Sequence, residues 1–261
     1  MCPLTNFDIQ PVVLGAAARV YRALGLKQAL QYAPVSVRSW VDDLKLKRRE
    51  RLVPEKALMR TYHDGLERLM NEIGRGAIGD YLEFGVYDGT SLCCMYKVLR
   101  QLGLNHVRLF GFDSFEGLPE CASIDDEGHW KPGQFASSYE LTERVLKVNR
   151  VDRSRVALIK GFYDKTLVPE TARQLGTTKA SVIMVDCDMY LSASDALRFS
   201  APLIRDRALI IFDDWNPLAA RNMGEKRAFD EFLAANTDCS VEEMPTYASN
   251  AKVFYLSRSL R

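Results

Sequence analysis

Five short apolar runs, separated by segments of helical spacing, constrain the fold of this chain more than any other feature. They occupy residues 80–85, 107–112, 156–161, 181–186 and 208–213. Continuous apolar strands that alternate with helices are typical of a parallel sheet with helices on both faces. Two later β-type runs, at 239–245 and 252–257, have only a short connection between them and predict a hairpin. We therefore predict an α/β fold with a doubly wound, mostly parallel sheet of seven strands in which the last strand is antiparallel.

The first 60 residues depart from this pattern and predict a helical, basic extension before an α/β domain at 61–261. Residues 38–53 carry six Lys or Arg against three acids, which is typical of a solvated helix face; a lid or partner-binding role is the alternative. Residues 12–26 are apolar but interrupted by Arg19 and Arg22, and they are too short to span a bilayer. They predict an amphipathic helix packed on the domain, or on a second subunit of a homo-oligomer, rather than a helix on a membrane surface.

The charge balance and the cysteines bear on the kind of substrate and on the compartment. A total of 35 basic and 34 acidic side chains leaves a formal net charge of +1. Such a balance provides no long-range attraction to nucleic acid or to an anionic membrane, so a small-molecule substrate is expected. Six cysteines without a C-x-x-C pair, in a chain large enough to need no disulfides, predict reduced thiols. The N-terminus has no signal-peptide pattern, and we expect a cytoplasmic protein.

Residues 79–94, GDYLEFGVYDGTSLCC, place an acid and two glycines where the first strand ends and a helix begins. Ligands of open parallel sheets bind beyond the carboxyl ends of the strands. Gly85 and Gly89 would let the backbone approach such a ligand, and the amides of Thr90 and Ser91 would present a helix N-terminus to its carboxylate or phosphate. Helix–strand packing is the alternative reason for the glycines, so the pattern is weak on its own.

Asp113, at the end of the second apolar run, favours a ligand that contains a ribose, because an acid there accepts the ribose hydroxyls. Dinucleotide-binding turns prefer G-x-G-x-x-G, whereas Val86 to Asp88 follow Gly85 here, and Asp88 would repel a pyrophosphate. Glu83 and Asp113 suit a ligand with an ammonium group and a ribose. The sequence therefore favours S-adenosylmethionine over NAD.

Two pairs of aspartates follow the fourth and fifth apolar runs, Asp186 with Asp188 and Asp213 with Asp214. Four carboxylates at adjacent strand ends repel one another unless a cation or protons intervene. Oxygen-only ligands suit Mg²⁺ or Ca²⁺ rather than zinc. Helix capping explains one such aspartate at a time but does not explain both pairs. We therefore predict a Mg²⁺ site at this edge of the sheet.

A metal at this edge has a chemical use, because binding a hydroxyl oxygen to Mg²⁺ lowers the pKa of that hydroxyl and fixes its position. Transfer of a methyl group then depends on geometry and on removal of one proton. Asp188 is the preferred base, and His129 is its rival. His129 lies in residues 116–137, a long irregular segment that predicts an active-site lid.

Four ordered motifs, YLEFGVYDGTS, GFDSFEGLPE, VDCDMYLSASDAL and IIFDDW, resemble the macrocin O-methyltransferase family, which methylates sugar hydroxyls of macrolide and aminocoumarin antibiotics. The resemblance covers roughly residues 55–257 and implies a Rossmann-like class I S-adenosylmethionine fold with a Mg²⁺ site. It implies Asp186, Asp213 and Asp214 as metal ligands and Asp188 as the base. The residues expected at the donor, from the strand ends and the resemblance together, are Glu83, Gly85, Tyr87, Gly89, Thr90, Ser91, Asp113, Ser114, Asp164 and Asp186.

The chain also departs from the family pattern. Family members often carry Trp-Arg-Gly-Gly where this chain has Tyr87 to Thr90, which bears on donor contacts or on a subunit edge. Catechol-type O-methyltransferases share a similar metal arrangement, but their lysine base would fall at Met189. We expect an S-adenosylmethionine- and Mg²⁺-dependent O-methyltransferase for a hydroxyl of a glycosylated or polyhydroxylated natural product, as in antibiotic biosynthesis. The alternatives are a phenolic diol as acceptor and a non-catalytic, donor-binding scaffold.

Overall fold

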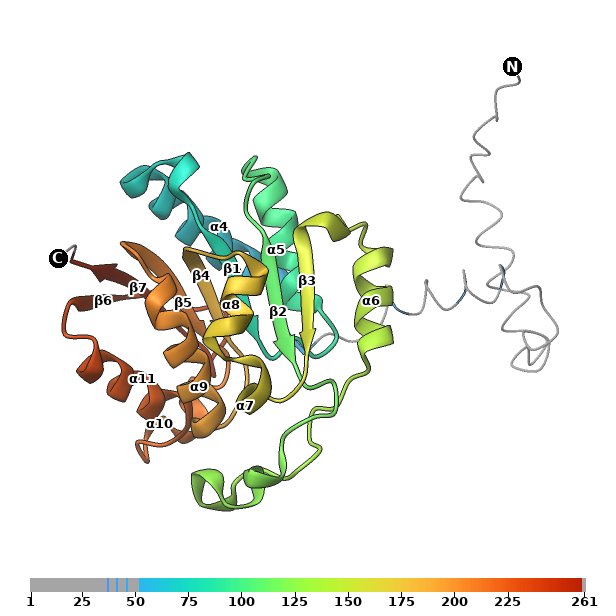
Figure 1. Cartoon of the computed structure of the whole chain (residues 1–261), viewed down its shortest axis with the longest axis vertical. Coiled ribbons are helices and arrows are strands. Elements are labelled where there is room, and N and C mark those ends of the chain that lie inside the picture. Colours follow the sequence, from blue (N-terminus) through green and yellow to red (C-terminus); the bar gives the residue numbers. More distant parts are fainter. Residues whose placement is uncertain (1–36, 38–40, 42–45, 47–51, 260–261) are drawn as a thin grey trace. The chain divides into compact units, whose positions relative to one another are not determined.

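The computed structural model describes residues 52–259 together with Val37, Val41 and Leu46. These residues form a seven-stranded sheet in the order β3-β2-β1-β4-β5-β7-β6 (Figure 1). The strands β1 to β5 are parallel, and β7 is antiparallel to both β5 and β6. The strands are β1 (Asp80–Phe84), β2 (Leu109–Asp113), β3 (Val156–Lys160), β4 (Ala180–Val185), β5 (Arg207–Phe212), β6 (Cys239–Met244) and β7 (Lys252–Arg258). The predicted fold class is confirmed, because each apolar run forms the strand expected of it.

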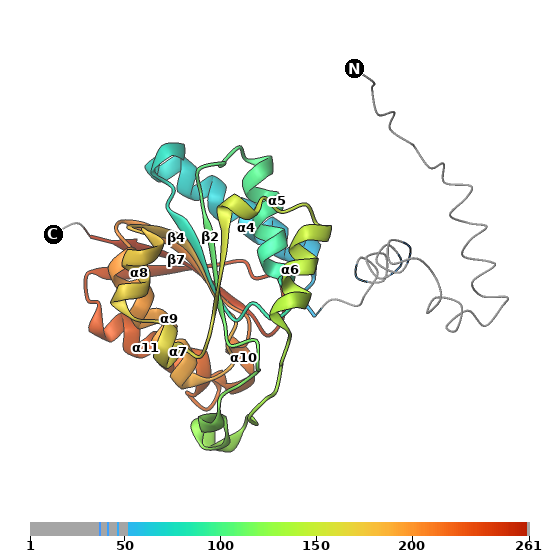
Figure 2. The same cartoon turned by 45° about the vertical axis from the view of Figure 1, so that its right-hand side comes forward.

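Helices cover both faces of the sheet, which lies between them in Figure 2. On one face α4 contacts α5 and β5, and on the other α9 packs against α11 and β4. The α-helices are α4 (Glu55–Ile73), α5 (Thr90–Gln101), α6 (Tyr139–Val148), α7 (Tyr163–Thr166), α8 (Pro169–Leu175), α9 (Tyr190–Ser200), α10 (Trp215–Ala219) and α11 (Gly224–Ala235). The 3₁₀ helices are η1 (Arg75–Ala77), η2 (Glu120–Ser123), η3 (Asp125–Gly128), η4 (Arg153–Arg155) and η5 (Ala201–Leu203).

The register of the sheet brings four strand ends to one level. Phe84 pairs with Phe112 of β2 and with Val185 of β4, and Val185 pairs with Phe212 of β5. The residues that follow these four in the chain are Gly85, Asp113, Asp186 and Asp213. Because parallel strands end at the same edge of a sheet, the four loops that carry chemistry begin side by side.

The two faces of β1 pack against different helices, although all five of its residues are buried. Leu82 and Phe84 belong to the apolar core formed with α9 and α11. Tyr81 instead meets Tyr62 of α4 edge to face, with ring centroids 6.0 Å apart. Successive side chains of a strand point to opposite faces. Glu83 therefore shares the α4 side with Tyr81, which decides its place in the site described below.

The chain divides into units at residues 1–50 and 51–261, and the sheet belongs to the second. The helix α4 crosses the boundary expected at 60/61, since Leu58 is buried in the same apolar stripe as Tyr62, Leu66 and Leu69. The basic helices expected before residue 52, with their suggested roles in a lid or in oligomerisation, lie outside the described residues. Within residues 52–259, no helix combines the length and the hydropathy of a membrane span.

Candidate active site

A pocket of about 1070 Å³ opens at the carboxyl ends of β1, β2, β4 and β5. The arrows of β2 and β3 point toward this edge and toward the lid loop, residues 116–137 (Figure 1). Both arms of the lid loop contribute to the pocket wall, through residues 116–121 and 132–135. The expected site residues that line the pocket are Gly85, Tyr87, Thr90, Ser91, Asp113, Ser114, Asp164, Asp186, Asp188, Asp213 and Asp214.

The turn after β1 requires glycine because other backbone and side-chain atoms approach it closely. Gly85 has φ +91°, and a Cβ there would lie 1.6 Å from the carbonyl oxygen of Asp186. Gly89 has φ +79°, and a Cβ there would lie 3.1 Å from Cγ2 of Thr142 in α6. Gly85 lines the pocket, whereas Gly89 does not. Packing against a strand and a helix thus gives a reason for both glycines, and the expected contact of Gly89 with the ligand stays a prediction.

Asp113 ties together two loops at the edge of the pocket. Its Oδ2 accepts hydrogen bonds from the backbone N–H groups of Val86 and Tyr87, both at 2.8 Å, and its Oδ1 accepts one from Phe115 at 2.6 Å. Burial raises the pKa of the Asp113 carboxyl, and the three N–H groups oppose that rise. A carboxylate has about four lone-pair positions, so about one remains to accept a hydrogen bond from a ligand hydroxyl.

Polar groups at the start of α5 and after β2 form hydrogen bonds with neighbouring residues of the same turns. Oδ1 of Asp88 accepts hydrogen bonds from the backbone N–H of Thr90 at 2.9 Å and from its hydroxyl at 2.6 Å. The hydroxyl of Ser114 donates to the Gly117 carbonyl at 2.8 Å and accepts from the Glu116 N–H at 3.0 Å. The first amide of α5 is therefore already bonded to Asp88, in contrast to the expectation that it faces a ligand.

Glu83 lies beneath the pocket and does not line its wall. The side chain is fully buried; its Oε2 accepts a hydrogen bond from the Tyr81 hydroxyl at 2.7 Å, and its Oε1 accepts one from the Ser91 hydroxyl at 2.6 Å. Burial raises the pKa of Glu83 to about 8, although both hydroxyls lower it. Strand alternation turns Glu83 toward α4 and places it under Ser91; its expected contact with the donor stays a prediction.

Three aspartates converge at the ends of β4 and β5, as the sequence predicts. The carboxylate oxygens of Asp186, Asp213 and Asp214 lie within 4.8 Å of one another. The Tyr247 hydroxyl donates a hydrogen bond to Oδ1 of Asp213. Behind Asp214, its backbone N–H donates to Oε2 of Glu225 at 3.1 Å. This set of oxygen atoms fits a hard divalent cation.

Burial raises the pKa of each carboxyl in this cluster. Burial, followed by the charges of Asp213 and Asp214, raises the pKa of Asp186 well above its usual range. Burial and the neighbouring Asp213 raise the pKa of Asp214 to about 6. The fully buried Glu225 also has a pKa well above the usual range, through burial and then the charge of Asp214. Carboxyls this close cannot all be ionised unless a cation neutralises them.

Asp188 lies beside the cluster in an uncommon backbone conformation. Its φ is +63°, it is buried, and its carboxyl hydrogen-bonds to that of Asp214. Burial and then Asp214 raise the pKa of Asp188 to about 8. Left-handed residues other than glycine are rare and concentrate at functional sites. The structure therefore brings a fourth carboxyl into the pocket wall next to the three convergent aspartates.

Two of the expected residues stand apart from the cluster. His129 is exposed and does not line the pocket, and its ring meets Trp130 edge to face with centroids 4.6 Å apart. The role of His129 as the rival base stays a prediction, for a side chain outside the pocket wall. Asp164, in α7, lines the pocket but is exposed, and its Oδ2 lies 3.0 Å from Nζ of Lys165.

Glu225 and Tyr247 belong to this site, although no sequence pattern predicts it. Glu225 lies at the start of α11, where an acid is an ordinary partner of the helix dipole. Tyr247 lies in the connection between β6 and β7 without a motif around it. Only the tertiary structure brings these two side chains behind the aspartates.

Known proteins resemble this chain in sequence and in fold. The family model described as macrocin-O-methyltransferase (TylF) matches residues 52–239. The 8-demethyl-8-(2,3-dimethoxy-alpha-L-rhamnosyl)-tetracenomycin-C 4'-O-methyltransferase of Streptomyces olivaceus is 30% identical over 171 residues, which cover 60% of this chain and 64% of that protein. The demethyldecarbamoylnovobiocin O-methyltransferase of Streptomyces niveus is 26% identical over 164 residues, which cover 58% of this chain and 61% of that protein. The chain thus spans less than two thirds of the length of either relative.

The same fold occurs in a solved structure, that of the O-methyltransferase NovP. It superposes with a TM-score of 0.63 at 23% sequence identity, covering 78% of this chain and 80% of that one.

Proposed function

The chain belongs to the macrocin-O-methyltransferase (TylF) family, and from this premise we propose that it is an S-adenosylmethionine-dependent O-methyltransferase. The acceptor would be a hydroxyl of a sugar or another polyhydroxylated natural product, and the reaction would use Mg²⁺. The proposal depends mainly on one observation. The carboxylate oxygens of Asp186, Asp213 and Asp214 lie within 4.8 Å of one another in the same pocket that Gly85 and Asp113 line.

The donor would lie over the turn after β1. The remaining lone pair of Asp113 would accept a ribose hydroxyl, and Tyr87 and Ser114 line the same part of the wall. Asp164, at the exposed side of the pocket, would lie near the adenine. A wall rich in carboxylates favours a ligand that carries a positively charged sulfonium and an ammonium group.

The metal would be held by Asp186, Asp213 and Asp214, with Tyr247 and Glu225 orienting two of these ligands from behind. Mg²⁺ prefers carboxylate and water oxygens, and this cluster offers that donor set. The raised pKa values of the cluster result from burial and then from neighbouring negative charge, which a cation would neutralise. When bound, the ion would lower the pKa of the acceptor hydroxyl and fix its position.

Asp188 would take the proton that the acceptor hydroxyl loses as its oxygen bonds to the methyl carbon. The bond between that carbon and the donor sulfur breaks in the same step, and S-adenosylhomocysteine leaves. Asp188 lines the pocket next to the metal-binding aspartates, and its buried position excludes most water from that proton transfer. A positioned base contributes roughly 10²–10⁴-fold to a rate. Alignment of the oxygen with the methyl group would supply most of the remainder, because such a transfer depends on geometry.

The rim of the pocket supports an acceptor with an apolar body. Leu52, Tyr87, Phe135 and Leu191 line the pocket and are exposed, Leu52 by 74%. Large apolar side chains exposed around a pocket favour a ligand with apolar surface. A glycoside fits this arrangement, with its sugar at the aspartates and its aglycone on the rim. The name of the Streptomyces olivaceus relative likewise specifies a rhamnosyl group on a tetracenomycin.

The environment of Met189 argues against a catechol-type mechanism. The side chain is fully buried and packs in a small cluster with Ala122, Trp130 and Leu218. A phenolic diol would therefore lack the lysine base that catechol-type enzymes use at this position. The scaffold alternative is disfavoured by the aspartates, because a protein that only binds the donor gains nothing from four mutually repelling carboxyls.

Calorimetry of donor binding with and without Mg²⁺, followed by mass measurement of acceptors, tests the proposal. We expect rhamnosides of aromatic aglycones to gain the mass of one methyl group with S-adenosylmethionine and Mg²⁺, and not in excess chelator. Methylation of phenolic diols alone would favour the second candidate. Donor binding that ignores Mg²⁺, with no methylation of either class, would favour the scaffold.

A further inference from the structure

The carboxylate of Asp126, in the lid loop, joins the N-termini of two helices that lie far apart in the sequence. Its Oδ2 accepts a hydrogen bond from the backbone N–H of Tyr190, the first residue of α9, at 2.8 Å. Its Oδ1 accepts one from the backbone N–H of Gly224, the first residue of α11, also at 2.8 Å. Asp126 is buried, so both bonds are shielded from water.

Neither helix has a capping side chain of its own. The N-cap residues are Met189 for α9 and Met223 for α11, and neither makes a side-chain cap hydrogen bond. A carboxylate at a helix N-terminus satisfies free N–H groups and interacts favourably with the helix dipole. The lid loop thus supplies a cap that the two helices share.

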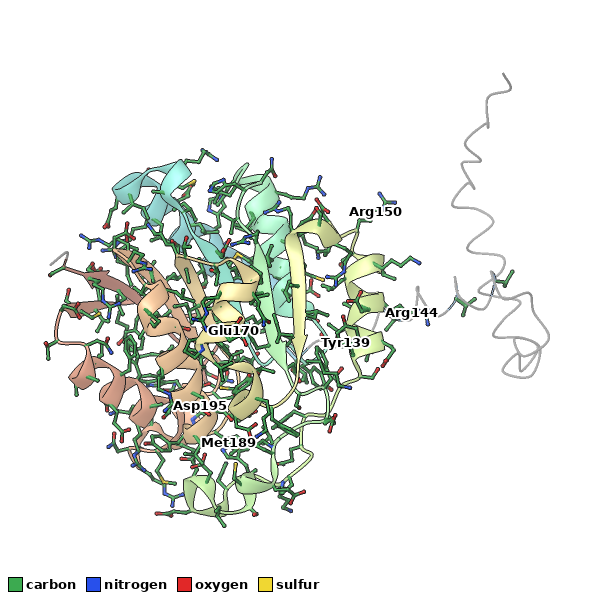
Figure 3. The ribbon with its side chains drawn as sticks, viewed as in Figure 1. Tyr139, Arg144, Arg150, Glu170, Met189 and Asp195 are labelled. Carbon is green, nitrogen blue, oxygen red and sulfur yellow. The ribbon has the colours of Figure 1, made fainter. Side chains whose placement is uncertain are left out.

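The lid loop is folded and packed so that Asp126 reaches this position. Asp126 and Glu127 both have positive φ, +47° and +57°, which turns the chain sharply at the tip. The lid residues Ala122 and Trp130 pack with Met189 and Leu218 in a separate apolar cluster. Figure 3 places Met189 at the end of α9 nearest the lid loop. Consecutive left-handed residues are unfavourable, and the cluster holds the loop in this form.

Both bonds of Asp126 lead to carboxyls of the site. Tyr190 is two residues beyond Asp188, whose left-handed conformation requires that the turn into α9 be held. Gly224 precedes Glu225, whose Oε2 accepts the backbone N–H of Asp214. A single carboxylate of the lid loop is therefore connected to the proposed base through two residues of chain, and to a proposed metal ligand through Glu225 and its hydrogen bond to Asp214.

We propose that Asp126 is a positioning residue that couples the lid loop to the geometry of the aspartates at β4 and β5; this rests on the function proposed above. It touches neither donor nor acceptor. Its carboxylate fixes the start of α9 relative to the start of α11, and so fixes Asp188 relative to Asp214. Residues that orient the ligands of a metal affect its affinity nearly as much as some ligands do.

The test compares Asp126→Ala with a matched loss of a cap elsewhere, Asp152→Ala. Oδ1 of Asp152 accepts the N–H of Ser154 in η4, which directly precedes β3 and so lies at the amino end of that strand, whereas the pocket lies at the carboxyl ends. For each variant, the dissociation constants of Mg²⁺ and of S-adenosylmethionine are measured by calorimetry. We expect Asp126→Ala to raise the Mg²⁺ dissociation constant roughly 10–100-fold, with donor binding unchanged. Asp152→Ala should alter neither constant.

If Asp126 only stabilised the fold, Asp126→Ala would instead weaken Mg²⁺ binding and donor binding in parallel, or would lower the melting temperature alone. Either result overturns the inference. If Asp126→Ala does not fold, Asp126→Asn decides, because its amide oxygen can accept only one of the two N–H groups and its NH₂ faces the other; unchanged Mg²⁺ binding in that variant overturns the inference too.

Hydrogen exchange of the unliganded protein provides a second readout that needs no metal. Asp126→Ala should lose protection at the amides of both Tyr190 and Gly224. Asp125→Ala should instead lose protection at Leu191 and Asp126, since Oδ2 of Asp125 accepts the Leu191 N–H at 2.8 Å and its Oδ1 accepts the Asp126 N–H at 3.1 Å, and it should keep protection at Gly224. Retained protection at Gly224 in Asp126→Ala overturns the shared cap. If the wild-type protein neither binds Mg²⁺ nor methylates an acceptor, the proposed function fails; if it does both and Asp126→Ala matches it, only this inference fails.

Discussion

The α-carbon of Gly85 at the end of β1 faces the carbonyl oxygen of Asp186 at the end of β4 so closely that a Cβ would lie 1.6 Å from it. The backbone N–H of Asp186 donates a hydrogen bond to the Phe84 carbonyl at 2.8 Å, which holds the two chains in this approach. The turn under the proposed donor and the first proposed metal ligand are therefore parts of one rigid contact. A shift of one would move the other.

Gly85→Ala should destabilise the fold by more than its backbone conformation alone explains. The positive φ costs about 1–3 kcal/mol, and the overlap with the Asp186 carbonyl adds to it. Gly74→Ala is the control, because Gly74 has φ +82° and nothing within 4 Å of the added Cβ. Urea unfolding of both variants measures the difference. Equal losses of unfolding free energy in Gly85→Ala and Gly74→Ala would show that the close approach to Asp186 adds no cost to that of the positive φ.

Asp113→Ala should weaken donor binding by about 1–3 kcal/mol, the range for leaving hydrogen-bond partners of a charged group unpaired. The variant removes the lone pair offered to a ribose hydroxyl and releases the N–H groups of Val86, Tyr87 and Phe115. Asp230→Ala, exposed on α11 and outside the pocket wall, is the control and should change donor affinity little. Calorimetry with S-adenosylmethionine measures both. An unchanged dissociation constant for Asp113→Ala would remove Asp113 from the ribose.

The fold could be predicted because its strands are continuous apolar runs whose ends coincide in register. The convergence of Asp186 and Asp213 follows from the same property, since both follow the aligned pair Val185 and Phe212. The direction of individual side chains was harder to predict. Glu83 lies within β1, and strand alternation turns it to the face covered by α4 and α5, where Tyr81 and Ser91 bond it and it does not line the pocket.

The positions of the lid-loop side chains depend on contacts between segments that are far apart in the sequence, so the sequence does not reveal them. Asp126 caps α9 and α11 from the lid loop, and no local pattern connects residue 126 to residues 190 and 224. His129 lies in the same loop, but the turn at residues 126–127 and its contact with Trp130 leave it exposed and away from the pocket. Loop residues can be recognised as candidates from composition, whereas their orientation depends on packing with the rest of the domain.

Asp213→Asn should abolish methyl transfer while leaving donor affinity nearly unchanged, because the lost carboxylate belongs to the metal cluster and not to the donor wall. Asp230→Asn is the matched control, since Asp230 is exposed on α11 and pairs with Lys226 at 2.5 Å. Activity is followed as the mass gain of the acceptor, and donor binding by calorimetry. Full activity of Asp213→Asn in excess chelator would remove the metal from the reaction.

The raised pKa values of the buried carboxyls give the metal-free protein a definite pH dependence. The pKa is about 8 for Asp188 and about 6 for Asp214 in the folded state, whereas an unfolded aspartate titrates near ~3.9. Below about pH 4 both states hold these protons, and the contribution to stability is complete. Above about pH 4 only the folded state holds these protons, up to about pH 6 for Asp214 and about pH 8 for Asp188, so the free energy of unfolding falls as pH rises through this range.

The melting temperature in chelator should therefore fall between about pH 5 and pH 8, and Mg²⁺ should raise it more at pH 8, where fewer protons compete for the aspartates. In Asp188→Asn the melting temperature should fall less steeply with pH, because an amide does not titrate. Glu83, with a pKa of about 8, contributes a fall of the same sign that Mg²⁺ does not relieve, since it lies outside the cluster. Melting curves across this range, with and without Mg²⁺, make the comparison. A chelated protein whose stability is constant or rises toward pH 8, or an Asp188→Asn variant with the full slope, would contradict the assignment of shared protons to this cluster.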